Sequence, residues 1–194
     1  MSALFRYLPL VILALAWETA SRLQLVSTLA LPPLSDVAIA WWDLLKSGEL
    51  ITNAADSLWR ASAGLFLSIV IGATIGIAMA WWRPAQIVLG PLVEALYPMP
   101  KSALIPVTVI WLGFGDSSKI LLILLGCMLP IAVGAYNGAR GSDQALVWSA
   151  RSMGASRMRM LWDVVVPSAT PELLNGIRTA LALSFILLVS SELI

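Results

Sequence analysis

Long apolar stretches alternate with polar connections along the chain, a pattern typical of helices that cross a membrane. Five stretches are long and apolar enough to span the roughly 30 Å hydrocarbon layer as helices. They cover approximately residues 7–25, 58–82, 87–112, 120–136 and 173–194. The pattern therefore predicts an all-α membrane protein that forms a single transmembrane domain over residues 1–194.

Small residues recur at every fourth position in the second stretch. They are Gly64, Ser68, Gly72, Gly76 and Ala80. This spacing places them on one face of a helix, where a neighbouring helix can approach closely. We assign that face to helix packing.

The third stretch cannot form one straight helix, because each of its prolines lacks a backbone N–H donor. These prolines are Pro91, Pro98, Pro100 and Pro106. The pattern predicts a bend or break near Tyr97, with Glu94 and Lys101 on either side of it. Irregular backbone at membrane depth is tolerated where it is buried in protein or lines a watery cavity.

Ionisable residues at such a break are candidates for lining a solute path. The candidates are Glu94, Pro98, Pro100 and Lys101, with Glu18 and Glu192 as further possibilities. An alternative is structural: Lys101 snorkels to the interface or pairs with Glu94 as a strut. The sequence leaves both interpretations open.

The connection before the second stretch contains a predicted short helix. Ser35 and Asp36 are expected to cap an amphipathic helix that runs through Leu45, and Ser47-Gly48 is expected to end it. Such a helix could cover the other helices as a lid or contact a delivery protein.

The polar segment between the last two stretches has its own regular pattern. Ser142 is expected to cap a helix whose apolar positions are Leu146, Val147, Ala150 and Met153. Gly154 then supplies the turn. The segment therefore predicts an elbow rather than a plain loop.

A second short helix is expected after this elbow. Ser156 restarts the helix, and its apolar positions are Met158, Leu161, Trp162 and Val165. Pro167 is expected to end it, and Thr170-Pro171-Glu172 is expected to cap the next membrane helix. Two short amphipathic helices joined by a glycine are suited to sit in a groove of another protein.

Composition supports the membrane setting and excludes several chemistries. Hydrophobic residues make up 59% of the chain and charged residues 12%, and the mean hydropathy is +0.88. The net charge of +1 argues against a nucleic-acid partner. A single cysteine, Cys127, excludes a disulfide framework or a cysteine-based metal cluster, and the lack of histidine excludes imidazole chemistry. Residues 1–22 contain no convincing cleavage site and are interpreted as a retained first helix.

Basic residues predict the orientation of the chain. If the N-terminus with Arg6 is cytoplasmic, the linker over residues 27–56 lies outside and the polar segment lies inside. That segment and its flanks contain Arg140, Arg151, Arg157, Arg159 and Arg178. The positive-inside rule therefore favours a cytoplasmic elbow.

These residues resemble the signature of permease subunits of bacterial ABC importers, which reads E-A-A, three residues, Gly, nine residues, then Ile-x-Leu-Pro. Trp148-Ser149-Ala150, Gly154 and Val164-Val165-Val166-Pro167 occupy it in register. Further similarities point to the nitrate, sulfonate and taurine branch. They are Ser57-Leu58-Trp59-Arg60 with Gly64, Pro98-Met99-Pro100 through Ala103, Ile105-Pro106, Trp111-Leu112-Gly113-Phe114-Gly115 with Ser118-Lys119, and Pro171 with Gly176-Ile177-Arg178.

The resemblance implies a MetI-like helical bundle of the type I importers, with about five of an expected six membrane helices and no cofactor. It implies a multi-pass inner membrane permease that is not itself an enzyme. The permease would be surrounded by membrane lipid and would form a homodimer or pair with a different permease chain. An ATP-binding subunit would drive alternating access, and a periplasmic or lipid-anchored binding protein would deliver a small anion such as a sulfonate, taurine or nitrate. The implied coupling residues lie at about 141–170: Trp148, Ser149, Ala150, Arg151, Gly154, Ala155, Val164, Val166 and Pro167.

Two departures from the family pattern keep an alternative open. Trp148 replaces the acidic first residue of the signature, so a buried aromatic anchor would replace a salt bridge. The chain also stops where the family continues, which suggests that the C-terminal part of the family domain is missing. The alternative is a nontransporting membrane scaffold or regulator, or a truncated inactive permease. A membrane-embedded enzyme is disfavoured, because the ionisable residues in the apolar stretches of this chain are too few and too scattered to act as an acid and base pair.

Overall fold

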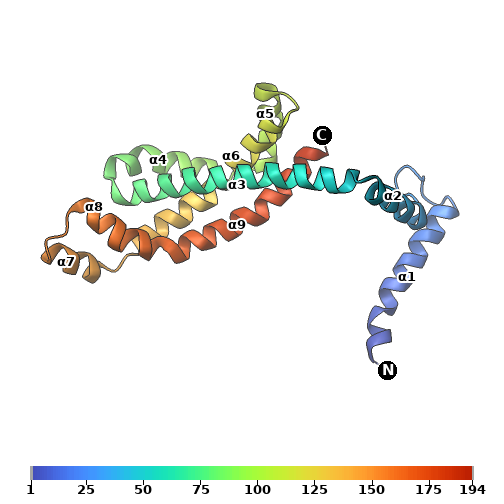
Figure 1. The fold of residues 1–194 in the computed structure, drawn as a ribbon, viewed down its shortest axis with the longest axis horizontal. Helices are drawn as coiled ribbons and strands as arrows, with labels where there is room; N and C mark the ends of the chain where they lie inside the picture. The colour runs from blue at the N-terminus through green and yellow to red at the C-terminus, as the bar shows by residue number, and fades with distance from the viewer. Residues whose placement is uncertain (1, 194) are drawn as a thin grey trace. The chain divides into compact units, whose positions relative to one another are not determined.

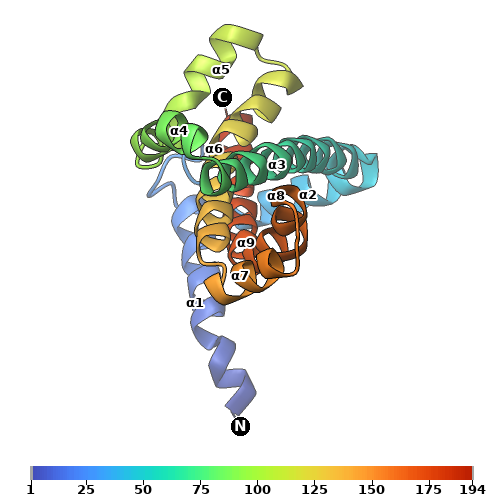
Figure 2. The same ribbon diagram turned by 90° about the vertical axis from the view of Figure 1, so that its left-hand side faces the viewer.

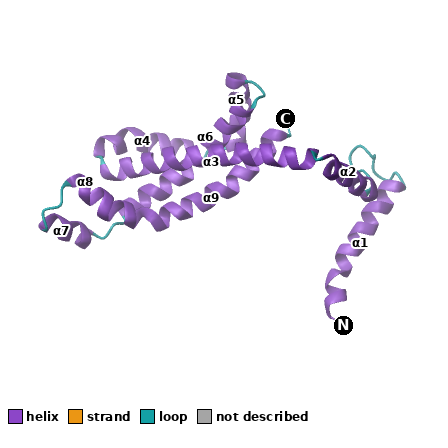
Figure 3. Cartoon of the chain, viewed as in Figure 1, coloured by secondary structure: helices purple, strands orange, loops and turns teal. Residues whose placement is uncertain are grey.

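The computed structural model describes residues 2–193, with side chains from residue 7 onward, and this part is helical without strands (Figure 3). The side chain of Arg6 lies outside the described part. The helices form two compact units, Met1–Asp56 and Ser57–Ile194. In chain order (Figure 1) they are α1 Ser2–Arg22, α2 Leu34–Ser47, α3 Glu49–Trp81, α4 Arg83–Leu96, η1 Lys101–Ala103, α5 Leu104–Leu112, α6 Asp116–Arg140, α7 Gln144–Ser152, α8 Arg157–Met160, η2 Leu161–Val165 and α9 Val166–Glu192.

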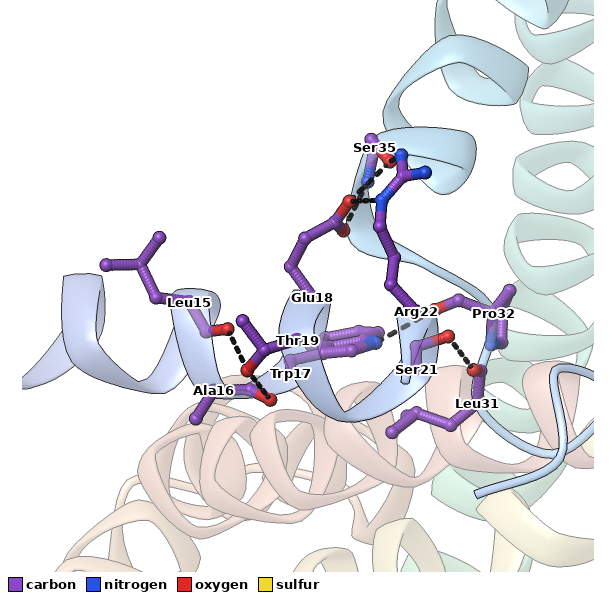
Figure 4. Close-up of polar contacts among 10 residues, drawn as sticks. All are labelled: Leu15, Ala16, Trp17, Glu18, Thr19, Ser21, Arg22, Leu31, Pro32 and Ser35. Atoms are coloured by element: carbon purple, nitrogen blue, oxygen red, sulfur yellow. Dashed lines mark hydrogen bonds and ion pairs between the residues drawn. The ribbon is translucent and has the colours of Figure 1, made fainter. Parts of the chain in front are cut away.

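In the first unit, side chains of α1 form hydrogen bonds to the loop that leads to α2. The Trp17 indole N–H donates to the Pro32 carbonyl at 2.9 Å, and the Ser21 hydroxyl donates to the Leu31 carbonyl at 2.7 Å (Figure 4). Ser21 is buried, so its hydroxyl needs this partner. The apparent loop is therefore held against α1.

The cap of α2 differs from the sequence prediction. The helix begins at Leu34, directly after Pro33, so Ser35 lies inside the first turn. The capping group is instead Glu18 of α1: its carboxylate accepts from the Ser35 N–H at 3.1 Å and the Ser35 hydroxyl at 2.8 Å (Figure 4). Arg22 donates to the same carboxylate at 2.7 Å. A negative charge suits a helix N-terminus, and local sequence could not reveal a cap that comes from 17 residues earlier. The end of α2 is as expected, with Gly48 at φ +81°.

The core of the second unit lies where α6 and α9 run side by side and α3 crosses them (Figures 1 and 2). Leu122, Ile123, Cys127 and Ile131 of α6 are completely inaccessible to solvent. They pack with Ala180 and other apolar residues of α9. Van der Waals packing of these side chains holds the helices together, and the buried Ser68 and Ser184 hydroxyls are hydrogen-bonded to backbone carbonyls.

The small residues of α3 face this core. A Cβ added to Gly64 would lie 2.8 Å from the Ile123 side chain, and one added to Gly72 would lie 2.6 Å from the Met128 carbonyl oxygen. Ser68 is buried, and its hydroxyl donates to the Gly64 carbonyl at 2.7 Å. The helices approach at a separation that only small residues allow.

Within the described residues, three helices are long and apolar enough to cross a membrane: α3, α6 and the continuous helix Arg157–Glu192. A fourth span can form from α4 and the segment Lys101–Leu112, which are bent by 95° around the break at residues 97–100. The predicted break near Tyr97 is thus confirmed. The further span predicted at residues 7–25, within α1, stays a prediction.

Candidate coupling segment and solute path

The first helix of the polar segment starts one residue later than predicted. Asp143, rather than Ser142, is its N-cap, and the carboxylate accepts from the Ala145 N–H at 2.8 Å. Ser142 is buried, and its hydroxyl donates to the Ala139 carbonyl at 2.8 Å. Both residue types favour caps, so local sequence did not discriminate between them.

The elbow forms at Gly154, which has φ +80° and open space around it. The Ala155 N–H closes the end of α7 by donating to the Ala150 carbonyl at 3.0 Å. Ser156 then caps α8, since its hydroxyl accepts from the Arg159 N–H at 3.3 Å. The turn at Gly154 and the restart at Ser156 therefore match the sequence prediction.

Pro167 does not end the second helix, and this prediction was wrong. The chain continues as one helix from Arg157 to Glu192. A π-helical turn, η2, precedes the proline, and the Val166 N–H bonds to the Leu161 carbonyl five residues back. Proline has no N–H, and its ring crowds the preceding turn of a regular α-helix. The wider turn accommodates it.

The cap predicted at Thr170-Pro171-Glu172 is consequently absent from the structure. These residues lie inside α9. The Thr170 hydroxyl donates to the Val166 carbonyl at 3.2 Å, within the same helix. A membrane helix can retain an internal proline where neighbouring side chains and helices satisfy the freed backbone groups.

The segment is anchored at one side and exposed at the other. Val165 is buried against Ala139 and Ala169. No residue of α7 is buried, and Trp148 is 67% exposed. Ser149 and Arg151 are exposed beside it. Val147 and Ala150 are half-buried, whereas Leu146 and Trp148 remain exposed, so the amphipathic helix α7 is only partly covered within the described residues.

A hollow of about 340 Å³ lies inside the elbow. Its lining residues are Ala150, Met153, Gly154, Ala155, Arg159, Met160, Asp163 and Val164. Arg159 and Asp163 form an exposed ion pair at 3.2 Å along one edge. Part of the motif is thus brought together around this hollow, namely Ala150, Gly154, Ala155 and Val164. The exposed Trp148, Ser149 and Arg151 do not line it, and Val166 and Pro167 follow directly in the helix.

Lys101 has a structural role at the break. Its ammonium group donates to the carbonyls of Leu96 at 3.4 Å and Met99 at 2.9 Å, and also to that of Tyr97. The Leu96 carbonyl also accepts from the Met99 N–H at 3.2 Å, whereas the carbonyls of Tyr97 and Met99 follow the end of α4, where the regular helical bonds stop. No ion pair joins Lys101 to Glu94 in the part of the chain described. The partners of Lys101 are the backbone carbonyls at the break instead.

The candidate path residues do not share one cavity. Glu94 lines a cavity of about 610 Å³ beside α6, and Lys101 lines another of about 390 Å³ beside α9. Glu192 lines a third of about 190 Å³. Pro98 and Pro100 are exposed at the break itself. Glu94, Lys101 and Glu192 therefore line three separate cavities within the described residues.

An ion-pair cluster that the sequence did not reveal joins three helices at one end of the second unit. Arg60 of α3 contacts Asp116 of α6 at 2.6 Å and Glu192 of α9 at 3.0 Å. The Ser57 hydroxyl donates to the same Glu192 oxygen at 2.6 Å. We call these four residues the Arg60 clasp. Its only sequence signal was the basic residue at the end of an apolar stretch.

Replacing Arg60 with glutamine is expected to reduce the stability of the bundle by about 1–2 kcal/mol, between the values for exposed and buried pairs. The Arg60 side chain is only 18% exposed, so its loss leaves Glu192 short of a partner. Thermal unfolding followed by size-exclusion fluorescence measures the change. The matched variant Arg159→Gln breaks an exposed pair and should have a smaller effect. Equal effects would contradict a structural role for the clasp.

Comparisons with known proteins place this geometry in context. The family model described as "Binding-protein-dependent transport system inner membrane component" matches residues 64–194. The taurine transport system permease protein of Escherichia coli (strain K12) is 38% identical over 190 residues, covering 95% of this chain and 69% of that protein. A putative aliphatic sulfonates transport permease protein of Bacillus subtilis (strain 168) is 34% identical, covering 96% of this chain and 67% of that protein.

A solved structure shares the fold. It is the MetNI methionine ABC transporter in an inward-facing conformation, with a TM-score of 0.58 and 24% sequence identity. The similarity covers 73% of this chain and 71% of the matched one. At this identity the similarity concerns the helical arrangement.

Proposed function

Because the chain belongs to the family of binding-protein-dependent transport system inner membrane components, we propose that it forms the path for a small organic sulfonate, such as taurine, in an ABC importer. Permeases of this family are multi-pass inner membrane proteins and not enzymes, and the family implies an ATP-binding subunit and a substrate-binding protein. The observation that carries the proposal is the exposed elbow of α7 and α8.

The ATP-binding subunit docks on this elbow. Leu146 of α7 is 53% exposed, and Met153, which directly follows the helix, is 79% exposed. An amphipathic helix with exposed apolar side chains fits a groove. Trp148 stands where the family signature has an acid, and it replaces a charge contact with a large apolar one. Buried tryptophans are frequent anchors of such interfaces.

Movement of the elbow is transmitted through the helix Arg157–Glu192. This helix has 36 residues, which corresponds to about 54 Å at the standard rise. It is anchored at Val165 beside the elbow and reaches the Arg60 clasp at Glu192. Closure of the ATP-binding subunits would tilt it against α6 and so exchange inward-facing and outward-facing states.

The orientation of the chain in the membrane and its pairing follow from this function. The N-terminus and the elbow face the cytoplasm, as the basic residues favour. Two copies pair to enclose one path, which accounts for the separate cavities lined by Glu94, Lys101 and Glu192 in a single copy. The similarity to a taurine transport permease and to a putative aliphatic sulfonates transport permease supports a sulfonate as the solute.

Replacing Trp148 with alanine is expected to weaken capture of the cognate ATP-binding subunit by about 30-fold, which corresponds to the ~2 kcal/mol of an interface anchor. Affinity is measured with the tagged chain in mild detergent. The matched variant is Trp59→Ala, which removes a tryptophan of similar exposure, 66%, near the clasp. It should leave capture unchanged. Equal capture by Trp148→Ala and the unsubstituted chain would argue against docking on α7.

A further inference from the structure

A polar cavity lies between α4 and α6 at the end of the second unit that carries the elbow. Its volume is about 610 Å³. The polar side chains in its lining are Arg83, Gln86, Glu94, Tyr136, Asn137 and Arg140. We call this cavity the arginine recess. Arg140 is the last residue of α6, so the recess lies directly beside the polar segment.

Hydrogen bonds organise one wall of the recess around a tyrosine hydroxyl. The Tyr136 hydroxyl oxygen accepts from the Gln86 amide at 2.8 Å and from the Arg140 guanidinium at 2.7 Å. The Arg140 guanidinium carbon also lies 5.6 Å from the centre of the tyrosine ring. Both lone pairs of the hydroxyl are thus occupied, and its own proton remains to be donated.

The two arginines have donor capacity in excess. A guanidinium carries five N–H donors, and Arg140 uses one of its donors on the neutral Tyr136 hydroxyl. Neither Arg83 nor Arg140 pairs with a carboxylate within the described residues. Glu94 is the one acidic group in the lining. Two positive charges against one negative charge leave the recess attractive to an anion.

Gly90 opens the α4 wall of the recess. It is buried, yet a Cβ added to it would meet no atom within 4 Å. The free space at this position therefore belongs to the recess and not to a helix contact. Ile87, also in the lining, is 65% exposed and offers an apolar contact next to the arginines.

We propose that the arginine recess binds a tetrahedral oxyanion, a sulfonate or a phosphate, through the guanidinium groups of Arg83 and Arg140 and the hydroxyl of Tyr136. Arginine suits such groups because its parallel N–H donors match two oxygens at once. Two sources carry this chemistry. One is the sulfonate group of the transported solute, and this source rests on the proposed function. The other is the phosphate of an anionic phospholipid, for which basic pockets between membrane helices are known binding places.

Binding is tested with two soluble probes added to the purified full chain in neutral detergent. Butanesulfonate, compared with butanol, represents the solute. Dihexanoylphosphatidylglycerol, compared with dihexanoylglycerol, represents the lipid. We expect saturable stabilisation against thermal unfolding by at least one anionic probe and none by its uncharged counterpart. Stabilisation by butanesulfonate alone identifies the solute as the source, and stabilisation by the phospholipid alone identifies the lipid. Stabilisation by both supports a shared oxyanion site.

Three variants place the binding in the recess. Arg83→Gln and Arg140→Gln should each raise the dissociation constant at least about tenfold, as expected for a charge-assisted contact. Gly90→Leu should do the same by filling the space without a clash at Cβ. Lys46→Gln makes the same charge change in the first unit and should have no effect. Equal dissociation constants in the unsubstituted chain and all three recess variants would overturn the proposal.

Failure of this proposal is separable from failure of the proposed function. Capture of the ATP-binding subunit is measured on the same preparations. If neither anionic probe binds while capture is retained, the recess proposal is wrong and the permease function stands. If the phospholipid binds in the recess while capture fails, the recess proposal stands and the docking proposal is wrong.

Discussion

Replacing Gly76 with alanine is expected to destabilise the helical bundle by about 1–3 kcal/mol, as overpacking of a tight core does. An added Cβ would lie 2.2 Å from the Ala132 carbonyl oxygen and 2.7 Å from the Ala135 Cβ. The first of these atoms belongs to the backbone of α6 and cannot turn away as a side chain can. The two helices would have to separate. Thermal unfolding in detergent measures the loss, as a lower midpoint temperature than that of the unsubstituted chain.

Gly90→Ala is the matched control for this variant. It makes the same substitution in a helix, and its Cβ meets no atom within 4 Å apart from those of the neighbouring residues in the chain. The gain of about 1 kcal/mol in helix propensity is opposed by Pro91, because a residue with a Cβ directly before proline is disfavoured in the helical region. The control should therefore shift the unfolding temperature much less than Gly76→Ala does. If both alanines shifted the midpoint equally, close packing of α3 on α6 would not be the reason for glycine at position 76.

The small-residue pattern of α3 was readable from sequence because helical periodicity alone places residues four apart on one face. The partner helix was not readable. The pattern did not distinguish α6 from the other apolar stretches, and the Arg60 clasp was missed for the same reason. Asp116 and Glu192 lie 56 and 132 residues from Arg60 in the chain. Contacts of that kind depend on how the helices assemble.

Replacing Gly154 with valine is expected to reduce ATP-driven transport by at least about tenfold, since a β-branched residue at positive φ is disfavoured by roughly 1–2 kcal/mol. Gly154 has φ +80° and no atom within 4 Å of an added Cβ. The cost is therefore one of backbone conformation and not of space. The elbow would open, and α7 would no longer be held at the angle to α8 that docking requires. Solute uptake is measured in proteoliposomes together with ATP hydrolysis, which should continue without uptake.

Asparagine at the same position separates this explanation from a general loss of folding. Asparagine tolerates the left-handed region far better than valine does, so Gly154→Asn should retain most of the transport. Membrane insertion and thermal stability of the bundle should remain unchanged in both variants, because Gly154 is exposed. Unchanged uptake by Gly154→Val would contradict the role of the elbow in coupling.

The elbow itself was largely predictable, whereas its continuation was not. Glycine at a turn and serine at a helix start act locally, so Gly154 and Ser156 could be interpreted from sequence. Pro167 was misinterpreted as a helix end, because the rule for proline holds for a regular α-helix. The π-helical turn before this proline has no simple signature in the amino-acid sequence. The difference matters for function, since an uninterrupted helix from Arg157 can transmit a displacement that a broken one would absorb.

For the candidate path residues, the sequence predicted the break in the helix but not the contacts of the side chains beside it. The break near Tyr97 followed from the prolines, but the role of Lys101 depended on carbonyls released by that break. A lysine beside irregular backbone has two uses, as a solute ligand or as a cap, and only the geometry of the carbonyls separates them. The arginine recess was missed because Arg83 and Arg140 are far apart in sequence, and Arg140 was assigned only to orientation.

ATP-driven uptake of taurine tests the central proposal most directly. The chain is reconstituted in proteoliposomes with its cognate ATP-binding subunit, and the substrate-binding protein is supplied on the outer side. We predict accumulation of labelled taurine that requires ATP, the binding protein and this chain together, and that is lost with Gly154→Val. An assembled complex that hydrolyses ATP yet accumulates neither taurine nor another sulfonate would contradict the account and favour a nontransporting scaffold.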